Sequence, residues 1–179
     1  GSNNVNLMEP RGQFGTRLMG GKDHASPRYI FTLINPVMKS LFPNDDMPLL
    51  NYLYDDGQKV EPDYFVPIIP LILINGSEGI GTGYSTSIPR YNPDDVINNV
   101  RRRLKGEPCV PMKPWYRGFL GTIEQGNPGQ YITKGIYHER NERVVDIMEL
   151  PIGNWTMPFK EFLEKGIHPV DSGKKKSTP

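Results

Sequence analysis

The sequence has few of the features that mark secreted, membrane and metal-binding proteins. Among its 179 residues there is one cysteine, Cys109, so no internal disulfide can form. The single cysteine and the lack of a signal-peptide pattern at the start of the sequence together indicate a reducing compartment. The longest apolar-rich run, residues 64–75, is about half a membrane span and contains two prolines, so we expect no membrane crossing. Zinc and EF-hand spacings are missing, so we expect no metal site in this chain.

Net charge is also low, with 21 Lys and Arg against 20 Asp and Glu, so overall charge alone would not hold the chain on nucleic acid. Its distribution is uneven. Residues 99–117 carry six basic residues and one acidic residue, whereas residues 44–63 carry six acidic residues and one basic residue. Each block could be a solvated face. The basic block is the stronger candidate for a binding surface because Trp115, Tyr116 and Phe119 lie beside it in the sequence.

Glycine and proline are abundant, at 19 and 18 residues, but they lack the triplet period of collagen. The apolar share of 36% can bury a core, which excludes a fully disordered chain. The periodic segments are short and separate, which excludes a coiled coil. Helix and strand patterns both occur, so the expected class is α+β.

In the first half, residues 1–24 show turn signals and favour an extended, loop-rich segment. Residues 28–33 are β-branched and aromatic, as in a short strand, and Asn35-Pro36 predicts a helix at about 36–42. Residues 64–74 are typical of buried extended chain bent at its prolines.

The clearest helix begins at Asn92-Pro93, with a capping side chain and a proline at the first helical position. Gly106 ends this helix. The apolar residues of the helix share one face, and they are Val96, Ile97, Val100 and Leu104. A proline-rich linker is expected at residues 107–115.

Beyond the linker, strand patterns at 119–125, 130–137 and 143–149 predict a meander, and a last helix is expected at about 158–164, ending at Gly166. The polar tail of residues 168–179 is expected to be a disordered basic tail.

The glycine-rich stretch at residues 74–83 is not a nucleotide-binding motif. Tyr84 stands where the dinucleotide motif has its third glycine, and no Gly-Lys-Ser/Thr follows. Ile80 lies between two glycines there. It either folds back from a tight turn into the core or is an exposed wedge, like the apolar side chains that minor-groove proteins insert between base steps.

Arg28-Tyr29 is a second candidate site. A tyrosine hydroxyl titrates near pH 10, so it needs help to act as a nucleophile. An adjacent arginine could pair with the phosphate under attack. Tyr29 could equally be one structural tyrosine among nine.

Several longer motifs occur together in one order, and together they resemble the breakage-reunion region of eukaryotic-type DNA topoisomerase II over about residues 1–165. They are Gly1-Ser2-Asn3-Asn4, Gly12-Gln13-Phe14-Gly15-Thr16-Arg17, Gly20-Gly21-Lys22-Asp23, Ala25-Ser26-Pro27-Arg28-Tyr29-Ile30-Phe31-Thr32, Glu61-Pro62, Pro67-Ile68-Ile69-Pro70, Ile74-Asn75-Gly76-Ser77-Glu78-Gly79-Ile80-Gly81-Thr82-Gly83, Gly121-Thr122-Ile123 and Glu149-Leu150-Pro151.

The resemblance implies that Tyr29 is the nucleophile that links to a DNA 5′ end, that Arg28 stabilises the transition state, and that Ile80 intercalates and bends the DNA. Trp155 matches a DNA-contacting position, although it could also be a half-buried aromatic on a sheet. Gly153 stands where a basic residue is expected in relatives, which weakens the case for a phosphate contact there. Arg17, Lys22 and His24 lie on the loop before Tyr29 and could hold the cleaved strand.

By the same resemblance, residues 1–105 form a winged-helix domain that is incomplete at its N-terminus, and residues 106–167 form the start of a β-rich tower domain. The whole enzyme is expected to be a nuclear, ATP-dependent homodimer that acts on double-stranded DNA. Mg²⁺ and ATP would both bind outside this chain, so the chain alone would not cleave DNA. A catalytically silent DNA-binding or scaffold fragment is the alternative, and a polyproline ligand at residues 108–114 is a further one.

Overall fold

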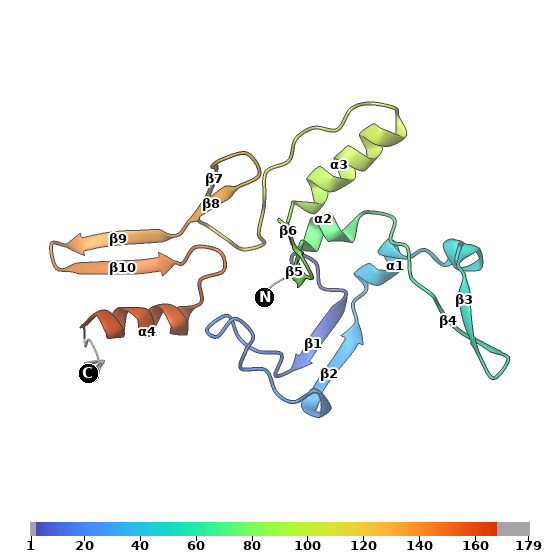
Figure 1. The fold of residues 1–179 in the computed structure, drawn as a ribbon, viewed down its shortest axis with the longest axis horizontal. Coiled ribbons are helices and arrows are strands. Elements are labelled where there is room, and N and C mark those ends of the chain that lie inside the picture. The colour runs from blue at the N-terminus through green and yellow to red at the C-terminus, as the bar shows by residue number, and fades with distance from the viewer. Residues whose placement is uncertain (1–2, 168–179) are drawn as a thin grey trace, which may run out of the picture.

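The computed structural model describes residues 3–167, and the expected tail at 168–179 lies outside them. Helices and strands are mixed in the described part, as expected for the α+β class. Each of its ten strands pairs with one neighbour, which gives five two-stranded antiparallel sheets (Figure 1). None of the described helices has the length and apolar character needed to span a membrane.

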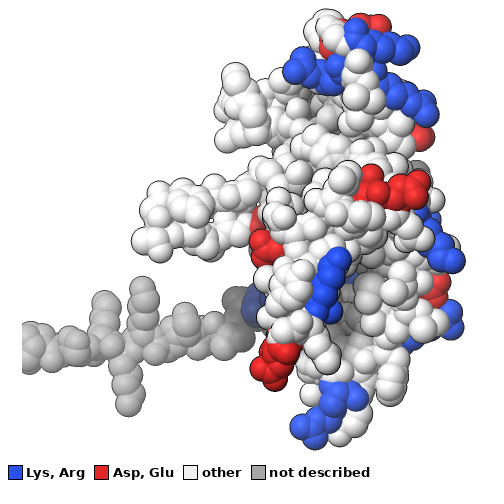
Figure 2. Space-filling model, turned by 90° about the vertical axis from the view of Figure 1, so that its right-hand side faces the viewer, with Lys and Arg blue, Asp and Glu red and all other residues white. Residues whose placement is uncertain are grey.

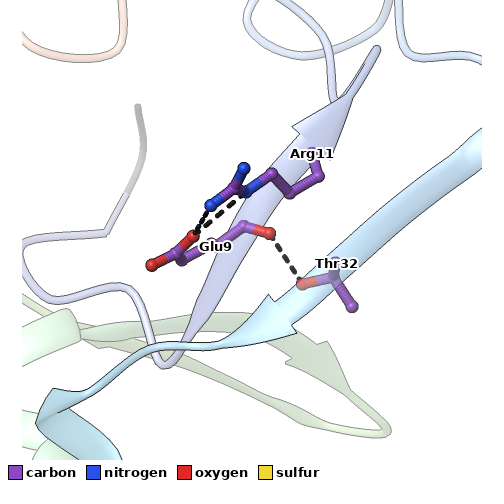
Figure 3. Close-up of polar contacts among 3 residues, drawn as sticks. All are labelled: Glu9, Arg11 and Thr32. Atoms are coloured by element: carbon purple, nitrogen blue, oxygen red, sulfur yellow. Dashed lines mark hydrogen bonds and ion pairs between the residues drawn. The ribbon is translucent and has the colours of Figure 1, made fainter.

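The first hairpin joins β1 (Met8–Gly12) to β2 (Ile30–Ile34), with Gly12 opposite Ile30. Thr32 Oγ1 donates to the Glu9 carbonyl at 2.7 Å, and Arg11 pairs with the Glu9 carboxylate at 2.7 Å (Figure 3). The sequence predicts an extended, loop-rich segment over residues 1–24, and the structure adds a paired strand, β1, within it. That strand has no apolar alternation of its own and is held by backbone pairing to β2.

The segment that follows contains two short helices and a hairpin. The expected strand at 28–33 begins later, at Ile30, because the 3₁₀ helix η1 (Pro27–Tyr29) precedes it. The expected helix at 36–42 is confirmed as α1 (Val37–Leu41). A second 3₁₀ helix, η2 (Asn44–Leu49), leads to the hairpin of β3 (Tyr52–Asp55) and β4 (Gln58–Pro62), at the opposite end of the molecule from α4 (Thr156–Ile167; Figure 1).

The expectation of buried extended chain at residues 64–74 is wrong. Leu71–Asn75 forms the helix α2, since Pro70 precedes its first turn and no proline interrupts it. Only Ile74 of this segment is fully buried, whereas Tyr64 and Ile68 are more than half exposed.

The glycine-rich stretch forms the hairpin of β5 (Ser77–Gly81) and β6 (Tyr84–Ile88). The next element is the predicted helix, α3 (Pro93–Leu104), and the Asn92 side chain accepts from the Asp94 N–H at 2.9 Å. Val96 is 1% exposed, but Leu104 is 83% exposed, so the apolar face is buried only near its start. The irregular linker that follows is fixed to α3 by two hydrogen bonds between Asn99 and Val110.

The second half forms two separate hairpins instead of one meander. These join β7 (Thr122–Gln125) to β8 (Tyr131–Lys134), and β9 (Ile136–Asn141) to β10 (Val144–Glu149). The expected strand at 130–137 divides at Gly135, where the backbone lies so close to the Glu149 carbonyl that a side chain would not fit. The last helix, α4, is longer at both ends than predicted and includes Gly166.

The apolar core is thin, contrary to the expectation from composition. Besides the prolines Pro62 and Pro114, only Leu41, Ile74 and Val96 are buried apolar residues in the described part. The accessible surface is 14778 Å², against about 8,800 Å² for a compact chain of this mass. Two-stranded hairpins explain the excess, because each lacks further strands and most have no helix packed on a face.

Asn4 is the one buried polar side chain among the described residues, and it holds several segments together. Its Nδ2 donates to the carbonyls of Ile74 at 2.9 Å and Trp115 at 3.0 Å, and its Oδ1 accepts from the Arg117 N–H at 2.9 Å. Asn4 therefore joins the N-terminal segment to α2 and to the end of the linker.

We expect Asn4→Ala to lower the free energy of unfolding by about 2–4 kcal/mol, because the buried Ile74 carbonyl and two part-buried backbone groups lose their partner. Urea unfolding measures the change. The exposed neighbour provides the control: Asn3→Ala should stay within about 0.5 kcal/mol of the wild type. Equal effects of the two substitutions would contradict the role given to Asn4.

Candidate functional site

Arg28 and Tyr29 lie at the surface, at the junction between η1 and β2. Pro27 begins η1, and the Tyr29 N–H donates to the Ser26 carbonyl at 2.9 Å. Because β2 is paired along its whole length with β1, the turn before it is fixed at one end. Tyr29 is 65% exposed and Arg28 is exposed beside it. Their side chains are therefore accessible to a large substrate.

The loop of residues 13–25 leads to this turn and is held by its own hydrogen bonds. The Asp23 carboxylate accepts from the Thr16 N–H at 2.8 Å and the Thr16 hydroxyl at 2.7 Å. These bonds, the hydroxyl first, lower the pKa of Asp23. The Ala25 N–H donates to the Gln13 carbonyl at 2.9 Å and closes the loop. The loop is thus a defined structure despite its exposure.

The three candidate phosphate contacts on this loop differ in their surroundings. Arg17 forms an ion pair with Glu149 of β10. His24 lies with Nδ1 2.9 Å from the Ala25 carbonyl, and Lys22 is exposed. The Arg17 charge is thus partly neutralised within the chain. Lys22 is the better placed of the two cations to meet a polyanion.

Ile80 projects from the β5–β6 hairpin and is 96% exposed. It lies opposite Ser85, one pair before the turn, and a side chain added at Gly79 would meet nothing within 4 Å. The interpretation that Ile80 folds into the core is therefore wrong. An almost fully exposed isoleucine at a hairpin tip has the shape of a wedge.

Trp155 lies just before α4, not on a sheet, and packs against the loop of residues 13–25. Gly20, at φ +62°, comes so close to the indole that an added Cβ would overlap it. Close by, the Met157 N–H donates to the Leu18 carbonyl at 3.0 Å. The loop before Tyr29 and the start of α4 are therefore in direct contact.

The sequence places the basic block beside aromatic residues, but in the structure only Lys113 and Arg117 of the block lie near Trp115 and Tyr116. Arg101, Arg102, Arg103 and Lys105 lie at the end of α3, and Figure 2 shows blue side chains gathered at that end of the molecule. Tyr91, just before α3, pairs with Pro114, so Trp115 lies at the opposite end of the helix, about 15 Å away. Arg102 also pairs with Glu107 at 3.1 Å.

The structure brings some of the candidate residues together and adds others. Arg17 and Trp155 line one small pocket, which Arg90, Tyr116 and Arg117 also line. Arg90 carries no local sequence signal, since it follows a strand without a motif of its own. Burial raises the pKa of Tyr116, and the nearby Arg90 guanidinium opposes this shift. Tyr29, Arg28 and Ile80 lie on open surface instead.

The described residues do not form a metal site. From Asn3 to Ile167, no group of three or more His, Cys, Asp or Glu side chains is placed to hold an ion. The acidic residues are dispersed over η2, the β3–β4 hairpin and the outer hairpins.

Comparison with known proteins identifies the family. The model for the A-subunit family of DNA gyrase/topoisomerase IV matches residues 1–176. DNA topoisomerase 2 of Pisum sativum is 57% identical over 165 residues, which are 92% of this chain and 11% of that protein. The chain belongs to the DNA topoisomerase II family.

Two further similarities agree with this assignment. DNA topoisomerase 2-alpha of Homo sapiens is 49% identical over 179 residues, all of this chain and 12% of that protein. A crystal structure of the Plasmodium falciparum topoisomerase II DNA-binding, cleavage and re-ligation domain matches with a TM-score of 0.84 and 49% identity, over 93% of this chain and 23% of that one. The chain thus spans about a ninth of the length of the curated topoisomerases it matches.

For this topoisomerase II chain, we expect Gly20→Ala to displace the Trp155 indole, which should shift the tryptophan emission in a Trp115→Phe background. Gly21→Ala is a matched control, because Gly21 also has a positive φ, +81°, but a side chain there would meet nothing within 4 Å. Backbone strain alone would affect both variants. An equal emission shift in both would contradict the packing of Trp155 on Gly20.

Proposed function

We propose that this chain is part of a type II DNA topoisomerase that makes a transient double-strand break through Tyr29 and passes a second duplex through it. One observation carries the proposal: an exposed tyrosine beside an arginine, on a hydrogen-bonded turn, in a chain 49–57% identical to eukaryotic DNA topoisomerases 2. A core tyrosine could not reach a DNA strand. The accessibility of Tyr29 therefore supports the role of nucleophile.

In the proposed reaction, the Tyr29 oxygen forms a bond to a backbone phosphorus and the bond from phosphorus to the 3′ oxygen breaks. The phenolic proton is lost to solvent, and the leaving 3′ oxygen takes up a proton. The phosphotyrosyl link replaces one phosphate ester with another, so resealing is the reverse step and needs no ligase. Arg28 pairs with the phosphoryl oxygens as charge develops on them.

Ile80 has the proposed role of opening a base step and bending the DNA. Its exposure and its place at the end of a free hairpin support this role, because an apolar side chain in water gains contacts when it enters a base stack. Lys22, Arg17, His24 and Trp155 are proposed DNA contacts next to the cleaved strand.

The domain division follows the same proposal, with a winged-helix domain at residues 1–105 and the start of a tower domain at 106–167. The end of α3 and the change from mixed elements to two hairpins support this boundary.

We also propose that the complete protein is a homodimer in the nucleus, and that its Mg²⁺ and ATP bind outside the described residues. The scaffold alternative predicts DNA binding without any covalent adduct.

We expect Tyr29→Phe to abolish the covalent protein–DNA adduct and to leave DNA affinity within about twofold, since only the attacking oxygen is lost. The test uses the full-length pea enzyme with these 179 residues in place of its matching segment. Adduct is scored after denaturation. Tyr54→Phe, which also alters a tyrosine exposed by 70%, is the control and should keep wild-type adduct levels. Adduct that persists in Tyr29→Phe would refute the proposal.

Arg28→Ala should lower the cleavage rate by about 100- to 1,000-fold, because a group that stabilises developing charge is removed. Rapid-quench cleavage assays on the same chimera measure the rate. A loss confined to DNA affinity, with the rate at saturating DNA unchanged, would contradict the role of Arg28.

The isolated 179-residue chain should form no covalent adduct with DNA at ordinary Mg²⁺ concentrations, because its described residues form no metal site. Incubation with supercoiled DNA, followed by denaturation and gel analysis, tests this. Any adduct at Tyr29 would overturn the expectation.

A further inference from the structure

Arg90 lies at the base of the hairpin that carries Ile80. The last paired residues of that hairpin are Ser77 and Ile88, so Asn75 and Arg90 would form the second pair beyond them. Arg90 Nε donates to the Asn75 carbonyl at 2.9 Å and closes the base. At Gly76, between these elements, a side chain would lie 2.6 Å from the Ile88 carbonyl. The two chains are thus held close together at the base.

The same arginine also binds the linker that leads into the second half of the chain. Its carbonyl accepts from the Trp115 N–H at 2.7 Å, and its guanidinium lies over the Tyr116 ring, 5.6 Å from the ring centroid. The face of a tyrosine ring attracts a guanidinium through its π electrons. Arg90 is therefore in contact with both the hairpin that carries Ile80 and the linker.

The outer part of the hairpin has little other support. Side chains added at Gly79 or Gly83 would meet nothing within 4 Å, and Tyr84 is 72% exposed. The direction of the hairpin is therefore set at its base. Ile80 lies three positions beyond Ser77, which is about 10 Å along a strand. A swing of about 10° at the base would then move Ile80 by about 2 Å, roughly half the spacing of about 3.4 Å between stacked bases.

We infer that Arg90 is a positioning residue for DNA bending: it holds the β5–β6 hairpin at a fixed angle to the linker, so that Ile80 meets one base step. This inference rests on the proposed role of Ile80. It extends that role because the direction in which Ile80 points is then set by Arg90, a residue that need not touch DNA. The Tyr116 ring supplies the surface against which the guanidinium is held.

The test uses the full-length chimera and measures DNA bending by energy transfer between dyes at the duplex ends, together with the covalent adduct. Arg90→Met keeps an unbranched apolar chain in place of the arginine stem but removes the Nε donor and the charge. We expect it to reduce the bent fraction and the adduct about three- to tenfold, with DNA affinity within about twofold. Tyr116→Leu, which removes the ring, should have a smaller effect in the same direction. Arg140→Met, which breaks an exposed ion pair with Asp146 on the β9–β10 hairpin, is the control and should change neither readout.

A double-mutant cycle separates positioning from general stability. If Arg90 acts through Ile80, Arg90→Met should have almost no further effect on bending or adduct in an Ile80→Ala background. Additive losses would overturn the inference, as would unchanged bending in both Arg90→Met and Tyr116→Leu. If the wild-type chimera forms no adduct at all, the proposed function fails. A wild-type adduct with no effect at Arg90 or Tyr116 refutes only the positioning role.

Discussion

The buried amide of Asn4 is the interaction on which the rest of this structure depends. With so few buried apolar side chains, hydrophobic contact alone does not fix the relative positions of the hairpins. Hydrogen bonds between segments take this role instead. Asn4 joins the N-terminal segment to α2 and the linker, and Asn75 adds a second link by donating to the Val5 carbonyl at 2.9 Å and accepting from the Val5 N–H at 3.0 Å. Directional bonds of this kind hold an open architecture in one arrangement, because each lost bond leaves a buried group unpaired.

The open architecture suits a polymeric substrate. Tyr29 is exposed at the turn that leads into β2, which is paired with β1, and Ile80 is exposed near the outer end of the β5–β6 hairpin. A duplex is too large for an enclosed pocket, so groups that act on it need to reach outwards from a rigid support. In the role proposed for Ile80, the cost of exposing this apolar side chain to water would be offset when the side chain enters the base stack. The contact of Trp155 with the loop before Tyr29 joins the second half of the chain to the same surface.

The sequence predicts the local elements that have strong signals of their own. The helix beginning at Asn92-Pro93 has a cap, a proline and a glycine stop, and it is confirmed within one or two residues. β1 could not be predicted because its pairing partner lies about 20 residues further on. The helix α2 was missed because its apolar run fits a buried strand equally well. The motifs identify Tyr29, Arg28 and Ile80 as candidates, but the exposure of Ile80 and the place of Arg90 depend on tertiary contacts, which no local pattern contains.

Tyr29 is proposed to form the covalent bond to DNA through its phenolic oxygen. The direct measurement traps the covalent complex of the full-length chimera, digests it with protease and nuclease, and locates the nucleotide-bearing residue by mass spectrometry. The account predicts one peptide, with a 5′-linked nucleotide on the oxygen of Tyr29. A nucleotide on any other of the nine tyrosines in this chain, or on a residue outside it, would contradict the account.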